Sequence, residues 1–405
     1  MQFVCLWNDD SIPDRLIFVF NRRKSCQKNA EAFSVSAMSN DEKKNVHTGA
    51  ALSKPAWIRV RVAEGDAYLE TLGRLRVHRL HTVCEEALCP NRGHCWSHGR
   101  ATILILGDRC TRHCRFCHVD KREVRPPDPD EPARVAAAVQ ASGLREIVLT
   151  SVTRDDLPDG GAGLWAETIR RVHAIDLRVS HCTGTEEAVG TQRSQSTIEA
   201  TESLVVAQNK QSSLCSRSSS ATSVATLQEV PLDFRILVEV LVPDFACSEA
   251  ALRQVCEAKP AVFGHNLETV PRLYPEVRPE ADYRRSLRVL RFAANAGRIT
   301  KTSLMLGMGE TREEIETTIL DARNAGVRIL YCGQYLQPTR AHLPVARYLT
   351  PTEFEEIGAL ARQIGFDFVA SAPLVRSSYH EDGQSAFVRQ TQKPTPRKNL
   401  LAPLF

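Results

Sequence analysis

The stretch ATILILGDRCTRHCRFC, residues 101–117, joins a run of six residues, five of them apolar, to a loop that holds three cysteines. The apolar run 101–106 is continuous rather than alternating, which is typical of a strand buried on both faces of a parallel sheet. The carboxyl ends of parallel strands meet at one edge, and in an α/β barrel that edge carries the ligands. We therefore expect a ligand site at Cys110, Cys114 and Cys117.

Strand-like apolar runs alternate with helical patterns along the chain from Pro55 onward. Further strands are expected at 147–152, 236–242, 262–265, 302–306 and 327–334, with a last extended run at 366–371. The helices that separate the strands are expected at 132–142, 164–173, 248–258, 281–296, 312–324 and 351–364. This alternation predicts an α/β fold, a parallel sheet covered by helices, in which six units form a partial or full barrel.

Composition divides the chain into four segments. They are a poorly ordered N-terminal extension, a segment with a further cysteine group, the barrel core and a C-terminal tail, at 1–53, 54–100, 101–383 and 384–405. The first segment has scattered acidic residues, unlike an acid-poor transit peptide. Met38 is an alternative start of the chain.

One long connection interrupts the barrel core. Residues 178–231 are rich in Ser, Thr, Gln and Ala, and a structureless connection of this length is uncommon inside a compact domain. We expect a disordered insertion there, with a small ordered subdomain as the alternative. Cys182 and Cys215 lie in this segment and are not expected to be ligands.

The chain has 13 cysteines, and six of them lie in the 34 residues from Cys84 to Cys117. A disulfide framework is typical of short secreted chains, but no secretory signal is recognisable in this chain of 405 residues. No apolar run reaches the about 18 residues that a membrane helix needs. The net charge of +4 is small for the length and does not indicate a nucleic-acid partner. We therefore expect a reducing compartment, thiolate metal ligands and no membrane partner.

The first cysteine group has the spacing C-x3-C-x2-C. Three closely spaced thiolates can hold three corners of a cubane iron–sulfur cluster. The remaining iron then has an open coordination position, as in catalytic metal centres that bind a further ligand. A structural zinc site is the alternative, but zinc prefers four ligands in paired C-x2-C spacing, which this loop does not show.

This spacing, with Phe116 before the last cysteine, resembles the signature of the radical S-adenosylmethionine superfamily. The resemblance implies a [4Fe-4S] cluster on Cys110, Cys114 and Cys117 whose open iron chelates the methionine group of S-adenosylmethionine. Reductive cleavage then gives a 5′-deoxyadenosyl radical. It also implies that Phe116 packs near the adenine.

A second group, Cys84, Cys89 and Cys95, has the spacing C-x4-C-x5-C. With the first group it resembles the lipoyl synthase family, and the resemblance covers about 54–383 without the insertion. Further motifs carry it: CPN at 89–91, CW at 95–96, TRDDLPDGG at 153–161, VLVPD at 240–244, HN at 265–266, ETVPR at 268–272, GQYLQP at 333–338 and RSSYH at 376–380.

The resemblance implies a second [4Fe-4S] cluster on Cys84, Cys89 and Cys95. In the family a serine oxygen from the RSSYH motif completes the ligands of this cluster. By position we assign that role to Ser378, with Ser377 as the alternative. Oxygen is a weaker partner for iron than thiolate, which fits the family's view that this cluster is the source of sulfur.

The fold that the resemblance implies is a partial (β/α)6 TIM-type barrel of the radical SAM kind, with N-terminal and C-terminal extensions covering its mouth. The implied activity inserts two sulfur atoms, at C6 and C8, into octanoyl-lysine on lipoyl carrier domains. Such C–H bonds resist acid–base catalysis, so a radical cofactor carries the difficult step.

Nine residues are candidates for contact with S-adenosylmethionine, because they lie at expected strand ends or in the first motif. They are Phe116, Asp159, Gly160, Gly161, Asn266, Gly307, Gly309, Glu310 and Gln334. A structural role is about equally expected for each of the softer candidates.

The implied partners are octanoylated lipoyl carrier domains, namely 2-oxoacid dehydrogenase E2 subunits and the glycine cleavage H protein. A reductant such as flavodoxin or ferredoxin and a cluster-repair carrier are also implied. Arg112, Arg115 and Arg376 are candidates to face an acidic carrier, with simple solvation as the alternative. A bacterial cytoplasm is expected, with a mitochondrial or plastid form as the alternative.

Two other functions stay open at this point. Another radical sulfur-inserting enzyme, such as a methylthiotransferase, usually carries an RNA-binding module and a different auxiliary cysteine pattern. A non-catalytic iron–sulfur protein would call for fully ligated clusters in a small fold. Reductive cleavage of S-adenosylmethionine would distinguish an enzyme from such a carrier.

Overall fold

The computed structural model describes residues 52–59, 65–175, 235–378 and 383–392. The expected insertion at 178–231 and nearly all of the expected N-terminal extension lie outside these ranges, so the statements about their order stay predictions.

Eight strands form one sheet in the chain order β1 to β8. They are β1 (His81–Thr82), β2 (Thr102–Ile105), β3 (Glu146–Ser151), β4 (Leu237–Leu241), β5 (Val262–Gly264), β6 (Ile299–Leu306), β7 (Ile329–Gln334) and β8 (Phe368–Ser371). Strands β2 to β8 are parallel, and β1 pairs antiparallel with β2. In the described part of the chain β1 and β8 do not pair, so the barrel is open between them.

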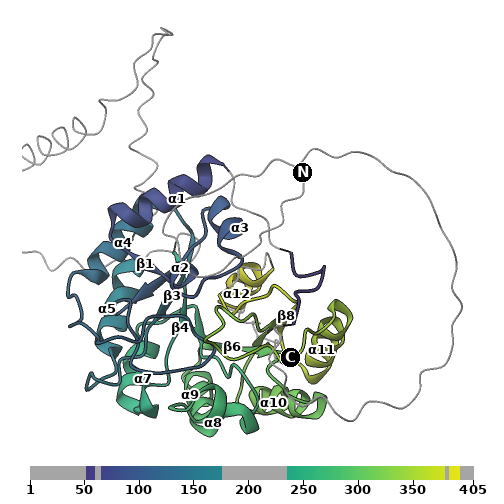
Figure 1. The fold of residues 1–405 in the computed structure, drawn as a ribbon. Coiled ribbons are helices and arrows are strands. Elements are labelled where there is room, and N and C mark those ends of the chain that lie inside the picture. Colours follow the sequence, from purple (N-terminus) through teal and green to yellow (C-terminus); the bar gives the residue numbers. More distant parts are fainter. Residues whose placement is uncertain (1–51, 60–64, 176–234, 379–382, 393–405) are drawn as a thin grey trace, which may run out of the picture. The chain divides into compact units, whose positions relative to one another are not determined.

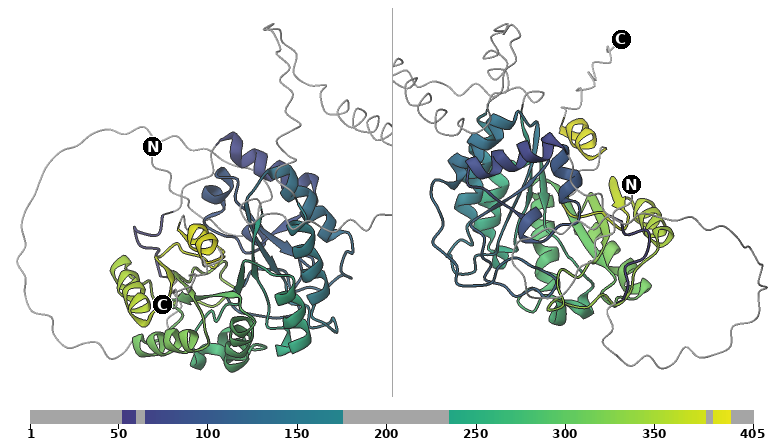
Figure 2. Two further views of the ribbon diagram at one scale, coloured as in Figure 1. Left: turned by 180° about the vertical axis from the view of Figure 1, so that it is seen from behind. Right: turned by 45° about the horizontal axis from the view of Figure 1, so that its top comes forward.

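Each strand from β2 to β7 is followed by a helix before the next strand begins. These helices are α4 (Glu131–Ser142), α5 (Ala162–His173), α7 (Glu249–Glu257), α9 (Tyr283–Asn295), α10 (Arg312–Asn324) and α11 (Pro351–Ile364). Figures 1 and 2 show them along the outer side of the curved sheet. Six strand–helix units confirm the expected partial (β/α)6 barrel, and the expected last extended run is the seventh parallel strand, β8.

Local side-chain chemistry fixes where several of these helices begin and end. Thr311 and Glu314 form a capping box at the start of α10, and Thr350 and Glu353 form another at the start of α11. Helix α4 ends at Gly143, whose φ of 64° lies in the left-handed region that favours glycine. These ends agree with the helix bounds expected from the sequence.

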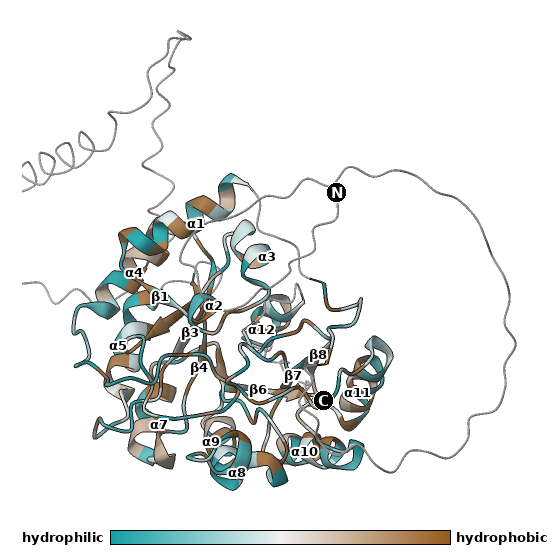
Figure 3. Ribbon diagram, in the orientation of Figure 1, coloured by the Kyte–Doolittle hydropathy of each residue, from teal (hydrophilic) through white to brown (hydrophobic). Residues whose placement is uncertain are grey.

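The main core lies between the sheet and its covering helices. All residues of β2 and β7 are buried, as expected of parallel strands that are covered on both faces. On α5, Trp165 and Ile169 lie four residues apart on the helix, and both are fully buried. Figure 3 shows hydrophobic residues concentrated on the strands. No helix within the described ranges is long and apolar enough to cross a membrane.

Additional elements precede, interrupt and follow the strand–helix units. Three helices come before β2 and one follows β8: α1 (Asp66–Val77), α2 (Val83–Glu86), α3 (Arg92–Ser97) and α12 (Gln384–Gln392). Short helices also lie in the connections after β4 and β5: η3 (Phe245–Cys247), η4 (Pro271–Leu273) and α8 (Tyr274–Val277). No helix was expected in the C-terminal tail, so α12 is a feature that the sequence did not predict.

Helix α12 closes the amino-terminal end of the barrel through a buried polar network. Lys301, on β6, donates to Glu239 Oε1 at 2.7 Å and to Gln384 Oε1 at 2.9 Å. Gln384 in turn donates to Glu239 Oε2 at 2.6 Å. The Lys301 ammonium also lies 3.8 Å from the ring centre of Tyr331. The network therefore joins the interior of the sheet to the C-terminal helix.

We expect Lys301→Met to lower the free energy of unfolding by about 3 kcal/mol, because removing one partner of a buried ion pair leaves the other charge uncompensated. Urea unfolding measures this change. The control is Arg74→Met, which removes an exposed pair with Glu70 and should cost less than about 1 kcal/mol. Equal effects of the two substitutions would contradict the stabilising role of the network.

Candidate functional site

A cavity of about 300 Å³ opens at the carboxyl ends of the strands, and we call it the barrel cavity. Cys110, Cys114 and Cys117 line it, together with Phe116. Cavities at this end of α/β barrels are the usual place for ligands. The structure thus brings the first cysteine group and its aromatic neighbour to the position that the sequence predicts.

The cysteine loop, residues 110–117, is held by backbone contacts to several neighbours. Cys110 N donates to Asp120 O at 2.8 Å, and Arg115 N donates to Val277 O at 2.9 Å. The Cys110 thiol accepts a hydrogen bond from Thr153 N at 3.3 Å. These contacts fix the loop at both ends.

Burial makes the cysteine thiols of this loop weak acids. It raises the pKa of Cys117 to about 12, with the nearby charges of Cys114 and Cys110 acting in the same direction. It also raises the pKa of Cys114, which the charge of Arg278 partly opposes. Cations bound among these thiols would favour the thiolate form and release protons.

The second cysteine group lines a smaller pocket, which we call the cysteine pocket. Its lining includes Cys84, Cys89, Cys95 and Ser378, and its volume is about 20 Å³. Burial and neighbouring thiolate charges raise the pKa of Cys84 to about 11 and that of Cys95 to about 12. A serine nearly 300 residues downstream therefore lies beside all three cysteines. Ser377, the alternative, lines the barrel cavity instead.

Side-chain and backbone contacts hold the C-terminal segment over the barrel. Asn91 Nδ2 donates to Leu374 O at 2.7 Å, across 283 residues of sequence. Gln334 N, at the end of β7, donates to Pro373 O at 3.1 Å. Residues from both extensions, Cys89 and Arg376 among them, line the barrel cavity, and these two also line the cysteine pocket. The two sites therefore lie next to each other.

Several buried polar groups line the barrel cavity without complete partners. His265 Nδ1 contacts Val242 O at 2.9 Å, and burial lowers the pKa of His265 to about 4, so the ring is neutral at pH 7. In the described residues His265 Nε2, Asn266 Oδ1 and Arg278 Nε have no hydrogen-bond partner. Buried polar atoms without partners are uncommon and indicate a ligand or water.

Asn266 and Gln334, both predicted from the sequence, line the barrel cavity. Sequence reasoning missed three further lining residues, His265, Glu268 and Arg278. The available signal was the position of His265 as the last residue of the predicted strand 262–265, with Glu268 three residues further on. Arg278 gave no comparable signal, because it lies in the connection between α8 and α9.

The other predicted cofactor residues do not line this cavity in the described structure. They are Asp159, Gly160, Gly161, Gly307, Gly309 and Glu310. The two carboxylates among them accept hydrogen bonds from backbone amides close to them in the sequence.

Asp159 accepts hydrogen bonds from Gly161 N at 2.9 Å and Gly163 N at 2.8 Å, at the start of α5. Glu310 accepts from the backbone amides of Gly307 and Met308. Asp159 and Glu310 therefore stabilise their own turns, and cofactor contact of these six residues stays a prediction.

Two of the three arginines expected to face a carrier are placed elsewhere. Arg112 is 6% exposed and is held by two carboxylates. Arg376 lines both internal sites, and its Nη1 donates to Val375 O at 2.7 Å. Arg115 is 48% exposed and pairs with Glu276 at 2.9 Å, so a role toward a carrier stays a prediction for Arg115 alone.

No three His, Cys, Asp or Glu side chains in the described ranges form a site for a single metal ion. The donor chemistry of both sites is nevertheless that of iron–sulfur ligation, because a complete group of three cysteines lines each.

Comparison with known proteins gives two kinds of match. Residues 104–199 match the family model described as the Radical SAM superfamily. A lipoyl synthase of Chlorobium chlorochromatii (strain CaD3) is 42% identical over 331 residues, 81% of this chain and 94% of the relative. A lipoyl synthase of Methylococcus capsulatus is 44% identical over 346 residues, 85% of this chain and 90% of the relative.

Among solved structures, methylornithine synthase aligns with a TM-score of 0.39 and 12% identity, over 78% of this chain and 85% of that chain.

Gly333→Ala should loosen the C-terminal segment, because an added Cβ would lie 2.0 Å from Val375 O. We expect the free energy of unfolding to fall by about 2 kcal/mol and residues 372–378 to exchange amide hydrogen faster. The control is Gly73→Ala in α1, where nothing lies within 4 Å and alanine should stabilise by roughly 0.5 kcal/mol. Unchanged exchange in Gly333→Ala would contradict the contact.

Proposed function

The chain belongs to the lipoyl synthase family of radical S-adenosylmethionine enzymes, and we propose that its residues divide one reaction between two iron–sulfur centres. It is a radical S-adenosylmethionine sulfurtransferase that inserts sulfur into an octanoyl group. The proposed substrate is octanoyl-lysine on a lipoyl carrier domain, with sulfur entering at C6 and C8. The single observation that carries the division of roles is the pair of adjacent sites, each lined by one complete group of three cysteines, with Cys89 of the second group lining both.

The barrel cavity fits a [4Fe-4S] cluster with S-adenosylmethionine. Three thiols supply the cluster ligands, and the cavity offers unpaired polar atoms on His265, Asn266 and Arg278. An anionic carboxylate next to the Arg278 guanidinium would gain a charge-assisted hydrogen bond. The neutral imidazole of His265 can accept a hydrogen bond at Nε2, because Nδ1 donates to Val242 O in that tautomer.

The cysteine pocket fits a second cluster. Cys84, Cys89, Cys95 and the Ser378 hydroxyl give four donors, three sulfur and one oxygen. Oxygen binds iron more weakly than thiolate does, so one corner of this centre is the easiest to release. We assign the sulfur-donating role to this pocket for that reason.

When bound, the first centre with S-adenosylmethionine supplies the radical that removes hydrogen from an unactivated carbon, and the second supplies the sulfur. The protein itself orients the acyl chain and keeps water away. Apolar side chains, among them Leu104, Val152, Leu241, Leu304 and Met305, line the barrel cavity beside the thiols. A dry, shaped cavity protects a reactive species from side reactions.

The proposed partners follow from the substrate and from the need for electrons. They are octanoylated E2 subunits of 2-oxoacid dehydrogenases or the glycine cleavage H protein, a flavodoxin- or ferredoxin-type reductant and a carrier that rebuilds the second cluster. We propose a bacterial cytoplasmic location, with a mitochondrial or plastid location as the alternative.

Two cysteine substitutions should separate the two centres. The reconstituted protein is incubated with an octanoylated lipoyl-domain peptide, S-adenosylmethionine and reductant, and the products are followed by mass spectrometry. We expect Cys89→Ala to keep reductive cleavage of S-adenosylmethionine but to add no sulfur to the peptide. Cys114→Ala should lose both reactions, because it removes a ligand of the first centre.

The outcome that would overturn the proposed division is lipoyl product from Cys89→Ala. Absence of S-adenosylmethionine cleavage in the parent protein would overturn the enzyme assignment itself. Cys256→Ala is the control for loss of a buried thiol, because Cys256 lies on α7 and lines neither site.

The two neighbouring serines give a further test. Ser378→Ala should reduce lipoyl product at least about tenfold, since a disturbed ligand environment typically costs 10- to 100-fold. Ser377→Ala should have a smaller effect on the iron content of the second centre, because Ser377 lines the other cavity. Each serine substitution is also made in the Cys114→Ala protein, which lacks a ligand of the first centre. Mössbauer spectra of these double variants then report the iron of the second centre separately. The reverse order of effects would show that Ser377 is the ligand.

A further inference from the structure

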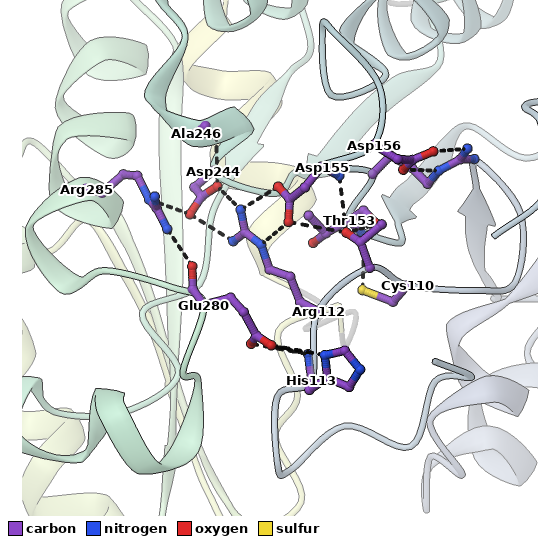
Figure 4. A network of polar contacts seen from close by, with 12 residues as sticks. Cys110, Arg112, His113, Thr153, Asp155, Asp156, Asp244, Ala246, Glu280 and Arg285 are labelled. Atoms are coloured by element: carbon purple, nitrogen blue, oxygen red, sulfur yellow. Dashed lines mark hydrogen bonds and ion pairs between the residues drawn. The ribbon is translucent and has the colours of Figure 1, made fainter. Parts of the chain in front are cut away.

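Arg112 lies in the three-residue interval between Cys110 and Cys114, and its guanidinium is buried. Figure 4 shows it between the carboxylates of Asp155 and Asp244. We call these three residues the Arg112 cluster. Asp155 follows β3 and Asp244 follows β4. The cluster therefore joins the loops that leave three neighbouring strands, β2, β3 and β4.

The hydrogen bonds of Arg112 use both edges of the guanidinium. Nε donates to Asp155 Oδ2 at 2.8 Å and Nη2 donates to Asp155 Oδ1 at 2.9 Å. On the other side Nη1 donates to Asp244 Oδ2 at 2.9 Å and Nη2 to Asp244 Oδ1 at 2.7 Å. Two bidentate pairs of this kind require the planar fork of arginine, which lysine cannot reproduce.

The charges of the cluster are balanced by a second arginine. The Asp244 side chain is fully buried, and Arg285 Nε lies 2.8 Å from its Oδ2. Ala246 N also donates to Asp244 Oδ1 at 3.0 Å. Two arginines thus face two carboxylates, of which Asp244 is buried and Asp155 is 42% exposed, and removing the charge of Arg112 leaves the buried Asp244 with one arginine.

The residues on either side of Arg112 are also tied to other loops. Thr111 Oγ1 donates to Thr153 O at 3.0 Å and accepts from Asp155 N at 3.1 Å. His113 Nδ1 lies 3.0 Å from Glu280 Oε1. All three residues between the first two cysteines therefore anchor the loop, and Cys110 and Cys114 line the cavity.

We propose that Arg112 is a positioning residue that sets the orientation of the cysteine loop for S-adenosylmethionine binding. This inference rests on the proposed function, since it assigns Arg112 to the first centre. Arg112 acts through Asp155 and Asp244. Four of the five N–H groups of its guanidinium donate to these carboxylates.

The matched pair of variants is Arg112→Lys and Arg115→Met, two changes within the same loop. Both are made in iron-loaded, full-length protein. Binding of S-adenosylmethionine is titrated by the change in the electron paramagnetic resonance spectrum of the reduced first centre, recorded in a Cys89→Ala background. Amide hydrogen exchange of a peptide covering 110–117 reports the loop itself.

We expect Arg112→Lys to retain iron but to bind S-adenosylmethionine about tenfold more weakly, because small misplacements of reacting groups have effects of this size or larger. Exchange at 110–117 should also be faster. Arg115→Met should match the parent in both measurements, because its pair with Glu276 is exposed. Parent-like affinity and exchange in Arg112→Lys would overturn the proposal.

A double variant separates positioning from general stability. Arg112→Met leaves two carboxylates around one arginine, and adding Asp155→Asn removes one of them, so thermal stability should partly recover. Affinity for S-adenosylmethionine should stay low in the double variant. If affinity recovered with stability, Arg112 would serve only to stabilise the fold, and the proposal would fail.

The proposed function and this inference fail in different ways. Failure of the parent protein to bind or cleave S-adenosylmethionine would overturn the function. The exchange comparison would still decide the positional role, because faster exchange in Arg112→Lys alone supports it and equal exchange in both variants overturns it.

Discussion

The parallel arrangement of β2 to β8 is the constraint on which the rest of the structure depends. It brings the loops that follow these strands to one edge of the sheet. The cysteine loop follows β2, Asp155 follows β3, Asp244 follows β4 and Glu268 follows β5. Groups far apart in the sequence therefore meet around one cavity. An antiparallel sheet of the same strands would send alternate loops to opposite edges.

Because these loops meet at one edge of the sheet, several charged side chains lie in a buried region. Each of them therefore needs a partner of opposite charge. A buried ion without a partner is costly in a medium of low polarity. Around the barrel cavity the chain meets this requirement with bidentate contacts, as between Arg112 and its two carboxylates. Burial alone would raise the pKa of Asp244, but the hydrogen bonds and charges of Arg112 and Arg285 hold it well below its usual range. Asp244 therefore stays ionised, which keeps the cluster intact.

Sequence reasoning succeeds here where a local pattern determines the structure. The apolar run 101–106 followed by cysteines predicts both a buried strand and a site at its end, because both follow from local order. The proximity of Ser378 to the second cysteine group was expected only through the family resemblance. Nothing local in the chain indicates it.

The failures have a common physical reason. Arg112 looks like an exposed loop residue, but its partners are 43 and 132 residues away. Arg278 likewise depends on contacts outside its own connection, because its Nη1 donates to Asn266 O and Leu267 O, 12 and 11 residues earlier. At 307–310, Glu310 accepts hydrogen bonds from the amides of Gly307 and Met308, and the contact of this turn with the cofactor stays a prediction.

The sizes of the two internal sites bear on how an acyl chain would reach the second one. Under the proposed function the second cluster occupies the cysteine pocket, so the acyl chain is left with the larger barrel cavity, of about 300 Å³. Cys89 and Arg376 line both. Under the proposed function, the acyl carbon therefore has to approach the second site from inside the barrel cavity. A carbon radical formed in that cavity can then meet sulfur without crossing water, which makes the boundary at Cys89 and Arg376 the point where the two half-reactions join.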